Sequence, residues 1–148
     1  MNIIITNQSG ISRNFFSWKD YEKVTFKMLS MINSEIIIDA IYANGEGPND
    51  LVSDQIWRKP SPNMIFRAAK DYKINLSKSI LIGDRLSDIT AGVNAGINNL
   101  YHLLTGHGSN EREQVIEKYF TKKNKFSINL IEDLTFFKKD NFASLGKL

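Results

Sequence analysis

Two short apolar runs, far apart in the sequence, each end abruptly in a polar loop. Residues 3–5 (Ile-Ile-Ile) lead into residues 6–10 (Thr-Asn-Gln-Ser-Gly), and residues 80–82 (Ile-Leu-Ile) lead into residues 83–88 (Gly-Asp-Arg-Leu-Ser-Asp). An apolar, β-branched run that stops at small polar residues and glycine predicts a buried strand with a polar loop at its carboxyl end. Because ligands bind at the carboxyl ends of parallel strands, we expect the two loops to contribute to one site.

Strands and helices alternate along the chain, which favours an α/β fold: a Rossmann-like parallel sheet with helices on both faces. The first helix is expected to follow the N-cap Ser17 and to bury a face through Val24 and Met28. Ser61 and Pro62 are expected to open the second helix. The strands are expected at 3–5, 35–42, 79–82, 99–104 and 126–130, and the helices at 17–32, 61–72, 86–95, 111–120 and 131–137.

Composition limits the classes of protein that fit. The 148 residues suffice for one domain over 1–148 with its own core. With no cysteine in the chain, disulfides and Cys-based zinc sites are excluded. No apolar run approaches the length of a membrane span, and the N-terminus lacks the layout of a signal peptide. A cytoplasmic protein with no membrane partner is therefore expected.

The net charge of +3 does not by itself indicate nucleic-acid binding. Basic residues gather near residues 118–125 and 138–147, without the interleaved aromatic residues of a nucleic-acid surface. We interpret them as a solvated face and expect no nucleic-acid partner.

The first polar loop carries groups that can bind a phosphate. Thr6 and Asn7 offer a hydroxyl and an amide, and Ser9 with Gly10 offers backbone N–H groups, which bind an anion without adding charge. Arg13 can add a bidentate contact. The alternative is an ordinary strand-to-helix turn, in which Asn7 and Ser9 bind local backbone.

Two adjacent cations, Arg58 and Lys59, precede Pro60. A lysine at a phosphoryl centre offsets the charge of the reacting group, and an arginine recognises a second phosphate or a carboxylate. The alternative is a pair of solvated loop cations. The segment before them, 44–57, is rich in turn-forming residues and long enough for an active-site flap.

The second polar loop is the strongest local signal. Gly83 allows a sharp turn after the strand, and the Asp84 carboxylate then suits a hard cation such as Mg²⁺. Asp88, one helical turn on, orients that site or caps the helix; alternatively, both carboxylates only favour a helix N-terminus. His102 and His107 lie far in sequence from any carboxylate cluster, so we read them as a strand and a loop residue and not as metal ligands.

Taken in order, the segments 6–13, 58–62 and 83–88 resemble the motifs of the haloacid dehalogenase (HAD) superfamily of phosphatases. The similarity runs from about residue 3 to about residue 105. Within the superfamily it is greatest to the heptose bisphosphate phosphatases, with the histidinol-phosphate phosphatases next. The resemblance implies a Mg²⁺-dependent phosphomonoesterase, a hydrolase of carbohydrate metabolism, that acts on a small sugar phosphate.

The resemblance also implies roles for individual residues. Thr6 and Lys59 would stabilise the transferred phosphoryl group, and Arg58 would recognise the distal part of the substrate. Asp84 would bind Mg²⁺, with Asp88 behind it in a supporting position. The remaining substrate contacts would come from Asn7, Gln8, Ser9 and Arg85.

The sequence departs from the family pattern twice. Relatives often carry a Cys/His zinc loop where residues 43–57 lie, and without cysteine zinc is not expected. The family also places its nucleophile and its acid/base in an Asp-x-Asp-Gly-Thr stretch, which would fall before Met1. Asp20, Asp39 and Asp50 lack the strand before and the Gly-Thr after that would let them replace it.

In the resembled fold the absent strand lies between strands 3–5 and 80–82, so we expect an N-terminally truncated domain with two unpaired apolar strand edges. The two strands then pair directly, or self-association or a second chain fills the gap, or the chain is a fragment of a longer product. Three functions stay open: a sugar bisphosphate phosphatase domain that is inactive as an isolated chain, a non-catalytic phosphate-binding or interaction subunit, and a histidinol-phosphate or polynucleotide-end phosphatase.

Overall fold

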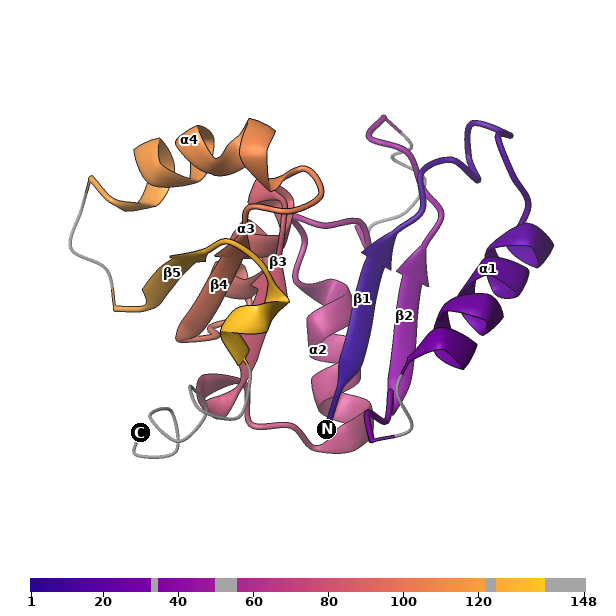
Figure 1. Cartoon of the computed structure of the whole chain (residues 1–148), viewed down its shortest axis with the longest axis horizontal. Coiled ribbons are helices and arrows are strands. Elements are labelled where there is room, and N and C mark those ends of the chain that lie inside the picture. The colour runs from indigo at the N-terminus through magenta and orange to yellow at the C-terminus, as the bar shows by residue number, and fades with distance from the viewer. Residues whose placement is uncertain (33–34, 50–55, 122–124, 138–148) are drawn as a thin grey trace. The chain divides into compact units, whose positions relative to one another are not determined.

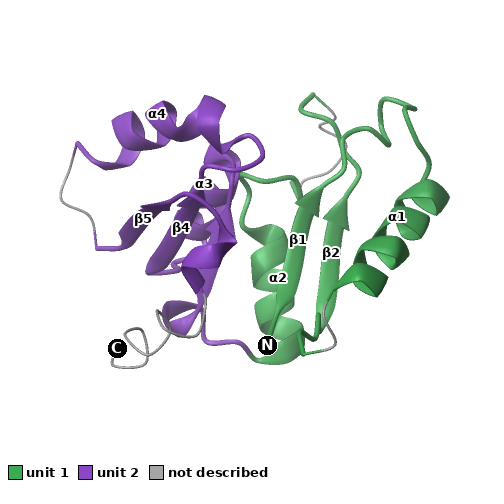
Figure 2. Cartoon of the chain, in the orientation of Figure 1, with its two compact units in different colours: residues 1–73 green, residues 74–148 purple. Residues whose placement is uncertain are grey.

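A computed structural model describes residues 1–32, 35–49, 56–121 and 125–137. The chain forms two compact units, Met1–Lys73 (unit 1) and Ile74–Leu148 (unit 2) (Figure 2). Among the described residues, no helix combines the length and the hydropathy that crossing a bilayer requires.

Unit 1 contains a two-stranded parallel sheet (Figure 1). Its elements in chain order are β1 (Ile3–Asn7), α1 (Trp18–Met31), β2 (Ala40–Asn44) and α2 (Asn63–Tyr72). The register pairs Ile3 with Ala40 and Asn7 with Asn44, so both strands end at the same edge of the sheet. Helix α2 packs on both strands and buries Met64, Ile65 and Ala68.

Unit 2 contains a three-stranded parallel sheet of order β3-β4-β5. Its strands are β3 (Ile80–Gly83), β4 (Asn99–Leu103) and β5 (Ser127–Ile131). Its α-helices are α3 (Leu86–Asn94), which contacts β3 and β4, and α4 (Gly108–Tyr119), which contacts α3 and β4. The core includes the fully buried side chains Ile89, Leu100 and Val115, and the short 3-10 helices are Leu76–Lys78 and Leu134–Phe137.

The parallel sheets with flanking helices confirm the α/β class. Each half of the predicted site lies at the carboxyl end of a strand that is an edge strand in its own sheet: β1 has β2 as its neighbour, and β3 has β4. Two expectations remain predictions: a further strand beside β1 and β3, and a single domain over residues 1–148.

The second strand was placed too early by the sequence. Strand β2 covers Ala40–Asn44, and the apolar triplet at 36–38 precedes it. Ile36 is 54% and Ile37 69% exposed, so the run that looked like a buried strand lies largely at the surface. Apolar composition alone does not distinguish a strand from the segment that leads into it.

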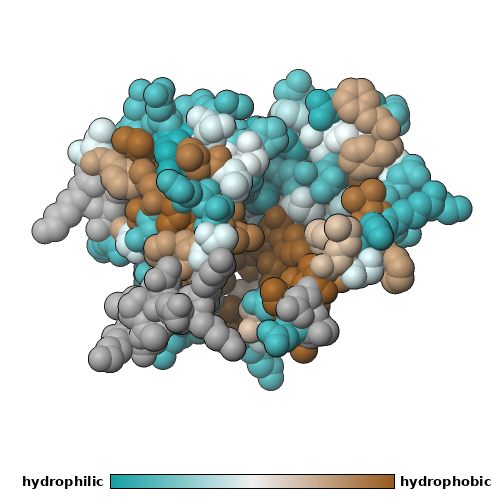
Figure 3. All heavy atoms as spheres, viewed as in Figure 1, coloured by the Kyte–Doolittle hydropathy of each residue, from teal (hydrophilic) through white to brown (hydrophobic). Residues whose placement is uncertain are grey.

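Helix α1 begins as predicted, but its apolar face is not buried. The Ser17 hydroxyl accepts a hydrogen bond from the Asp20 N–H, and Asp20 accepts one from the Ser17 N–H, a reciprocal N-terminal cap. No residue of α1 is buried, and Val24 is 68% exposed. Figure 3 shows hydrophobic side chains at the surface in the region of α1. Apolar residues at helical spacing predict an apolar face on the helix, but they do not predict whether another element covers that face.

Three further boundaries differ from the predictions. Helix α2 begins at Asn63 with Pro62 as its cap residue, although the Ser61 hydroxyl still accepts a hydrogen bond from the Asn63 N–H. Helix α4 begins at Gly108 and not at residue 111, so part of the predicted loop is helical. The predicted last helix is a single 3-10 turn at 134–137, because β5 continues through residue 131.

Candidate functional site

The first polar loop turns sharply after β1. The Gln8 N–H donates to the Asn44 carbonyl at 2.6 Å, and the Ile11 N–H donates to the Gln8 carbonyl at 3.0 Å. Gly10 is buried, and a Cβ at this position would collide with the ring of Phe16. The glycine is therefore required by close packing at the turn.

Asn7 and Lys59, 52 residues apart in sequence, are joined by paired hydrogen bonds. The Asn7 amide donates to the Lys59 carbonyl at 3.1 Å, and its oxygen accepts from the Lys59 N–H at 3.0 Å. The Lys59 ammonium also donates to the Ile5 carbonyl at 2.7 Å, and the Lys59–Pro60 peptide bond is cis. The structure thus brings these two predicted site residues together at the carboxyl end of β1.

The other residues of the first loop bind one another. The Gln8 amide donates to the Thr6 hydroxyl at 2.9 Å. The Arg13 guanidinium donates to the Ser9 carbonyl at 3.1 Å and to the Ser9 hydroxyl at 3.2 Å, and it stacks over the Phe15 ring at 4.9 Å. Hydroxyl, amide and guanidinium groups therefore gather on one turn, the donor set that an anion requires.

Arg58 is tied to the loop after β2. Its Nη1 donates to the Glu46 carbonyl at 3.0 Å. Asn44, the last residue of β2, in turn donates to the Glu46 carboxylate at 3.0 Å and accepts from the Glu46 N–H at 3.0 Å. Sequence reasoning missed Asn44 and Glu46. Asn44 carries the signal that identified Asn7, an amide at the last position of a strand, so the same rule would have found it.

The second polar loop also requires its glycine. A Cβ on Gly83 would collide with the Asp88 side chain. Asp84 follows, and its Oδ2 accepts the His107 N–H at 2.7 Å. Gly106 has a φ of +64°, and a Cβ there would collide with the Asp84 carboxylate. The loop before α4 therefore lies directly against the predicted metal ligand.

Asp88 caps helix α3. The side chain is 7% exposed, and its Oδ2 accepts the Arg85 N–H at 3.1 Å. This is the capping role that the sequence left open beside support of a metal site, and a carboxylate at a helix N-terminus is favoured by the helix dipole.

Arg85 is bound by Glu111 of α4, a residue that sequence reasoning missed. Oε1 of Glu111 accepts from Nε and Nη2 of Arg85 at 2.9 Å and 2.7 Å, while Oε2 accepts the Leu86 N–H at 2.7 Å. An acidic residue in the first turn of a helix is too common a feature to single out from sequence.

His102 lies in β4 and His107 in the turn just before α4, so the sequence placed the first in a strand and the second in a loop correctly. His102 is fully buried, and neither ring nitrogen has a hydrogen-bond partner within the described residues. Burial lowers the pKa of His102, and the nearby Arg112 charge lowers that pKa further. The imidazole is therefore neutral near pH 7.

The donor set fits Mg²⁺ better than zinc. Over the part of the chain that the structure describes, no three His, Asp or Glu side chains cluster as a ready metal cage. Mg²⁺ commonly binds one or two carboxylates and completes its shell with water and substrate phosphate, so the single Asp84 carboxylate suits it. Structural zinc takes four protein ligands, rich in Cys and His, which the described residues do not offer.

Parallel strands with amide, ammonium and carboxylate groups at their carboxyl ends define a HAD-like α/β protein, and comparisons with known proteins agree. A family model described as HAD-hydrolase-like matches residues 56–133. The chain belongs to this family.

This chain is similar to proteins named heptose-1,7-bisphosphate 7-phosphatases, some for the alpha and some for the beta anomer. It is 40% identical over 137 residues to a D-glycero-alpha-D-manno-heptose-1,7-bisphosphate 7-phosphatase of Photorhabdus laumondii, an alignment covering 88% of this chain and 73% of the relative. It is 38% identical over 99 residues to a D-glycero-beta-D-manno-heptose-1,7-bisphosphate 7-phosphatase of Helicobacter pylori, covering 66% of this chain and 55% of that protein. The chain thus spans between about half and three quarters of these relatives.

A solved structure has the same fold. The D,D-heptose 1,7-bisphosphate phosphatase from B. bronchiseptica, complexed with magnesium and phosphate, superposes with a TM-score of 0.76 at 26% identity. The match covers 99% of this chain and 74% of that one.

Proposed function

We propose that this chain is the phosphoryl-binding and Mg²⁺-binding part of a sugar bisphosphate phosphatase, with a D-glycero-D-manno-heptose 1,7-bisphosphate as its substrate class. The paired hydrogen bonds between Asn7 and Lys59 carry the structural side of the proposal, because they hold the Lys59 backbone at the end of β1, where the Lys59 ammonium donates to the Ile5 carbonyl. The names of the relatives and of the solved structure support the substrate class.

The residues of unit 1 would bind the phosphates. Lys59 and the Thr6 hydroxyl would offset the charge of the transferred phosphoryl group, and the Gln8 amide orients that hydroxyl. Arg58, tied to Glu46, would bind the distal phosphate of the substrate. Ser9 and Arg13 would complete the loop that surrounds the substrate.

The residues of unit 2 would bind the cation and a substrate oxygen. Asp84 would hold Mg²⁺ through its carboxylate, while the His107 N–H fixes the orientation of that carboxylate. When bound, Mg²⁺ would offset phosphoryl charge. Asp88 supports the loop as the cap of α3, and Arg85 would contact the substrate.

The 148 residues lack the Asp-x-Asp-Gly-Thr stretch that supplies the family nucleophile. We therefore propose binding without turnover for these 148 residues alone, because the nucleophile must come from residues outside them. A non-catalytic phosphate-binding subunit, whose function would need no nucleophile, is the second candidate. No observation favours a histidinol-phosphate or polynucleotide-end phosphatase.

Calorimetric titration in Mg²⁺ tests the substrate class. We expect heptose 1,7-bisphosphate to bind more tightly than histidinol phosphate, and Lys59→Met to abolish the binding of both. Lys70→Met, which removes the same charge from the exposed face of α2, is the control and should leave affinity unchanged. Equal affinity for the two ligands would contradict the substrate class, and binding by Lys59→Met equal to wild type would contradict the site.

A further inference from the structure

Glu111 makes defined contacts with both the side chain of Arg85 and the backbone of α3. One carboxylate oxygen accepts two N–H groups of Arg85, and the other accepts the N–H of Leu86. The Glu111 side chain is 17% exposed, whereas that of Arg85 is 47% exposed. A largely buried carboxylate with a partner on each oxygen thus holds a guanidinium that reaches toward solvent.

Glu111 contacts one edge of the Arg85 guanidinium and does not contact the other edge. Arginine has five N–H donors in a rigid planar fork. Glu111 binds the edge formed by Nε and Nη2, and within the described residues Nη1 donates to no acceptor. The edge formed by Nη1 and the second N–H of Nη2 has the spacing that binds two oxygens of a phosphate side by side.

The carboxylate of Glu111 is itself fixed by the fold. Leu86 is the first residue of α3, so its N–H carries the partial positive charge of a helix N-terminus. Helices α3 and α4 pack together, and the segment just before Glu111 supplies the His107 N–H to Asp84. The start of α4 therefore fixes both functional side chains of the second loop.

We propose that Glu111 is a positioning residue that orients the outer edge of Arg85 toward a phosphate of the substrate. The proposal rests on the proposed function, which makes Arg85 a substrate contact. Glu111 touches no substrate; it removes the rotational freedom that Arg85 would otherwise lose on binding, and such preorganisation strengthens binding.

Two readouts on the full chain test the proposal in Glu111→Gln, which has one acceptor oxygen in place of two. We expect affinity for inorganic phosphate in Mg²⁺, measured by calorimetry, to fall about five- to tenfold with the loss of one oriented charge-assisted contact. In NMR spectra without phosphate, we expect the Arg85 Nε–H signal to exchange slowly with water in the wild type and rapidly in the variant.

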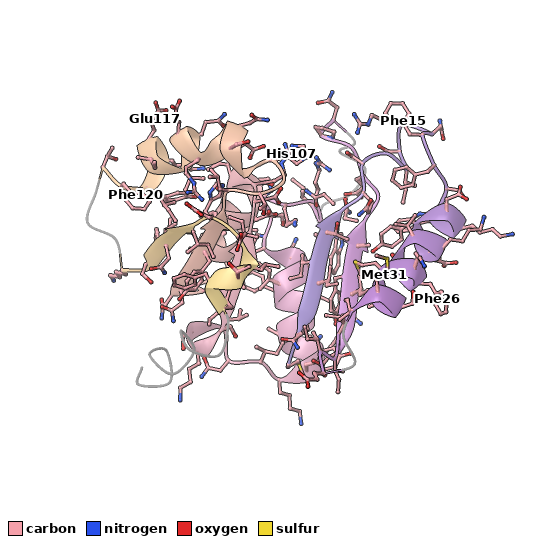
Figure 4. All side chains as sticks on the ribbon, in the orientation of Figure 1. Phe15, Phe26, Met31, His107, Glu117 and Phe120 are labelled. Atoms are coloured by element: carbon pink, nitrogen blue, oxygen red, sulfur yellow. The ribbon has the colours of Figure 1, made fainter. Side chains whose placement is uncertain are left out.

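The control is Glu117→Gln, the same change on the same helix. Figure 4 shows Glu117 on α4, where its side chain is exposed. It should preserve both the affinity and the slow exchange. In an Arg85→Ala background, Glu111→Gln should cause no further loss, because its effect passes through Arg85. Glu111→Asp, which keeps the charge but shortens the reach, replaces the glutamine variant if that variant does not fold.

Unchanged or tighter phosphate binding by Glu111→Gln would overturn the proposal, since a carboxylate that only neutralised Arg85 would compete with the ligand. An equal loss in the Arg85→Ala background would also overturn it. The NMR measurement distinguishes a failure of the positioning role of Glu111 from a failure of the proposed phosphate-binding function. If the wild type bound no phosphate, the proposed function would fail even with a slowly exchanging Nε–H, and rapid exchange in the wild type would refute the orientation by Glu111 itself.

Discussion

The amide of Asn7 pairs with the backbone of Lys59 through both a donor and the acceptor. Asn7→Ala removes both bonds, so we expect phosphate affinity to fall nearly as far as in Lys59→Met. The loss of these two partly buried hydrogen bonds should also lower the free energy of unfolding by about 1–3 kcal/mol. Asn63→Ala is the matched control, because Asn63 donates one amide hydrogen bond, to the Ile56 carbonyl. Equal phosphate affinity in the two variants would contradict this role for Asn7.

His102 makes the stability of unit 2 sensitive to acid. Burial lowers its pKa below the ordinary 6.5, and the Arg112 charge adds to this effect, while Asp84 and Glu111 act in the opposite direction. The unfolded chain then binds a proton that the folded one resists, so stability is complete above pH 6.5 and falls as the pH drops toward the folded pKa. Thermal unfolding should show this acid loss in the wild type.

The matched pair for that measurement is His102→Phe and His107→Asn. The first removes a buried titrating ring and should flatten the dependence of the melting temperature on pH between 7 and about 5. The second changes an exposed histidine and should preserve the dependence. The same slope in His102→Phe as in the wild type would show that another group titrates.

The residue types of the site could be predicted from sequence, because strand-end glycines, amides and carboxylates have local signals. Their partners could not. Arg58 binds the Glu46 carbonyl and Arg85 binds Glu111, contacts that join residues 12 and 26 positions apart and depend on how the chain folds back. From sequence, Asn7 was expected either to bind a phosphate or to bind nearby backbone in a turn, and its hydrogen bonds to Lys59 are neither of these.

At the scale of elements, the turn between α3 and β4 and the loop between β4 and α4 depend on two distinct properties of glycine. Gly96, after α3, and Gly106, before α4, both have positive φ, but a Cβ on Gly96 would meet nothing within 4 Å whereas one on Gly106 would meet Asp84. Gly96→Ala should lower the free energy of unfolding by about 1 kcal/mol through backbone strain. Gly106→Ala should lower it by about 2–3 kcal/mol, because steric collision adds to strain.

Urea denaturation of the two variants checks this difference, and phosphate titration in Mg²⁺ checks its consequence. Only Gly106→Ala displaces the Asp84 carboxylate, so only this variant should lose the increase in phosphate affinity that Mg²⁺ produces. Equal losses of stability, with unchanged Mg²⁺ dependence, would show that the loop does not position Asp84.

Elements with strong local signals were predicted well. The Ser17 cap marks the start of α1, and α3 spans Leu86–Asn94 where a helix was expected at 86–95. The errors lie where tertiary packing decides. Val24 of α1 and Ile37 before β2 fit apolar patterns but stay exposed, because no local pattern records whether a partner surface exists.

At the scale of the whole molecule, the absent Asp-x-Asp stretch should decide between binding and turnover. We expect the purified 148-residue protein to release negligible phosphate from heptose 1,7-bisphosphate, because positioning and charge do not replace a nucleophile. A phosphate-release assay with Asp84→Asn as control checks this. Release by the wild type that is abolished in Asp84→Asn would refute it.

The family and the α/β class could be read from three short segments, since those segments carry the chemistry of the site. The division of the chain into two compact units could not be predicted from the sequence. The boundary between the two compact units falls between residues 73 and 74, within a segment that has no glycine or proline to mark it. Of the predicted site residues, Lys59 belongs to unit 1 and Asp84 to unit 2.

The central claim is that this chain binds a phosphate through Lys59 and a magnesium ion through Asp84. Calorimetric titration of the 148-residue protein with inorganic phosphate, with and without Mg²⁺, tests it most directly. The wild type should bind phosphate more tightly with Mg²⁺, Lys59→Met should not bind it under either condition, and Asp84→Asn should lose only the effect of Mg²⁺. No binding by the wild type, or identical titrations for all three proteins, would contradict the claim.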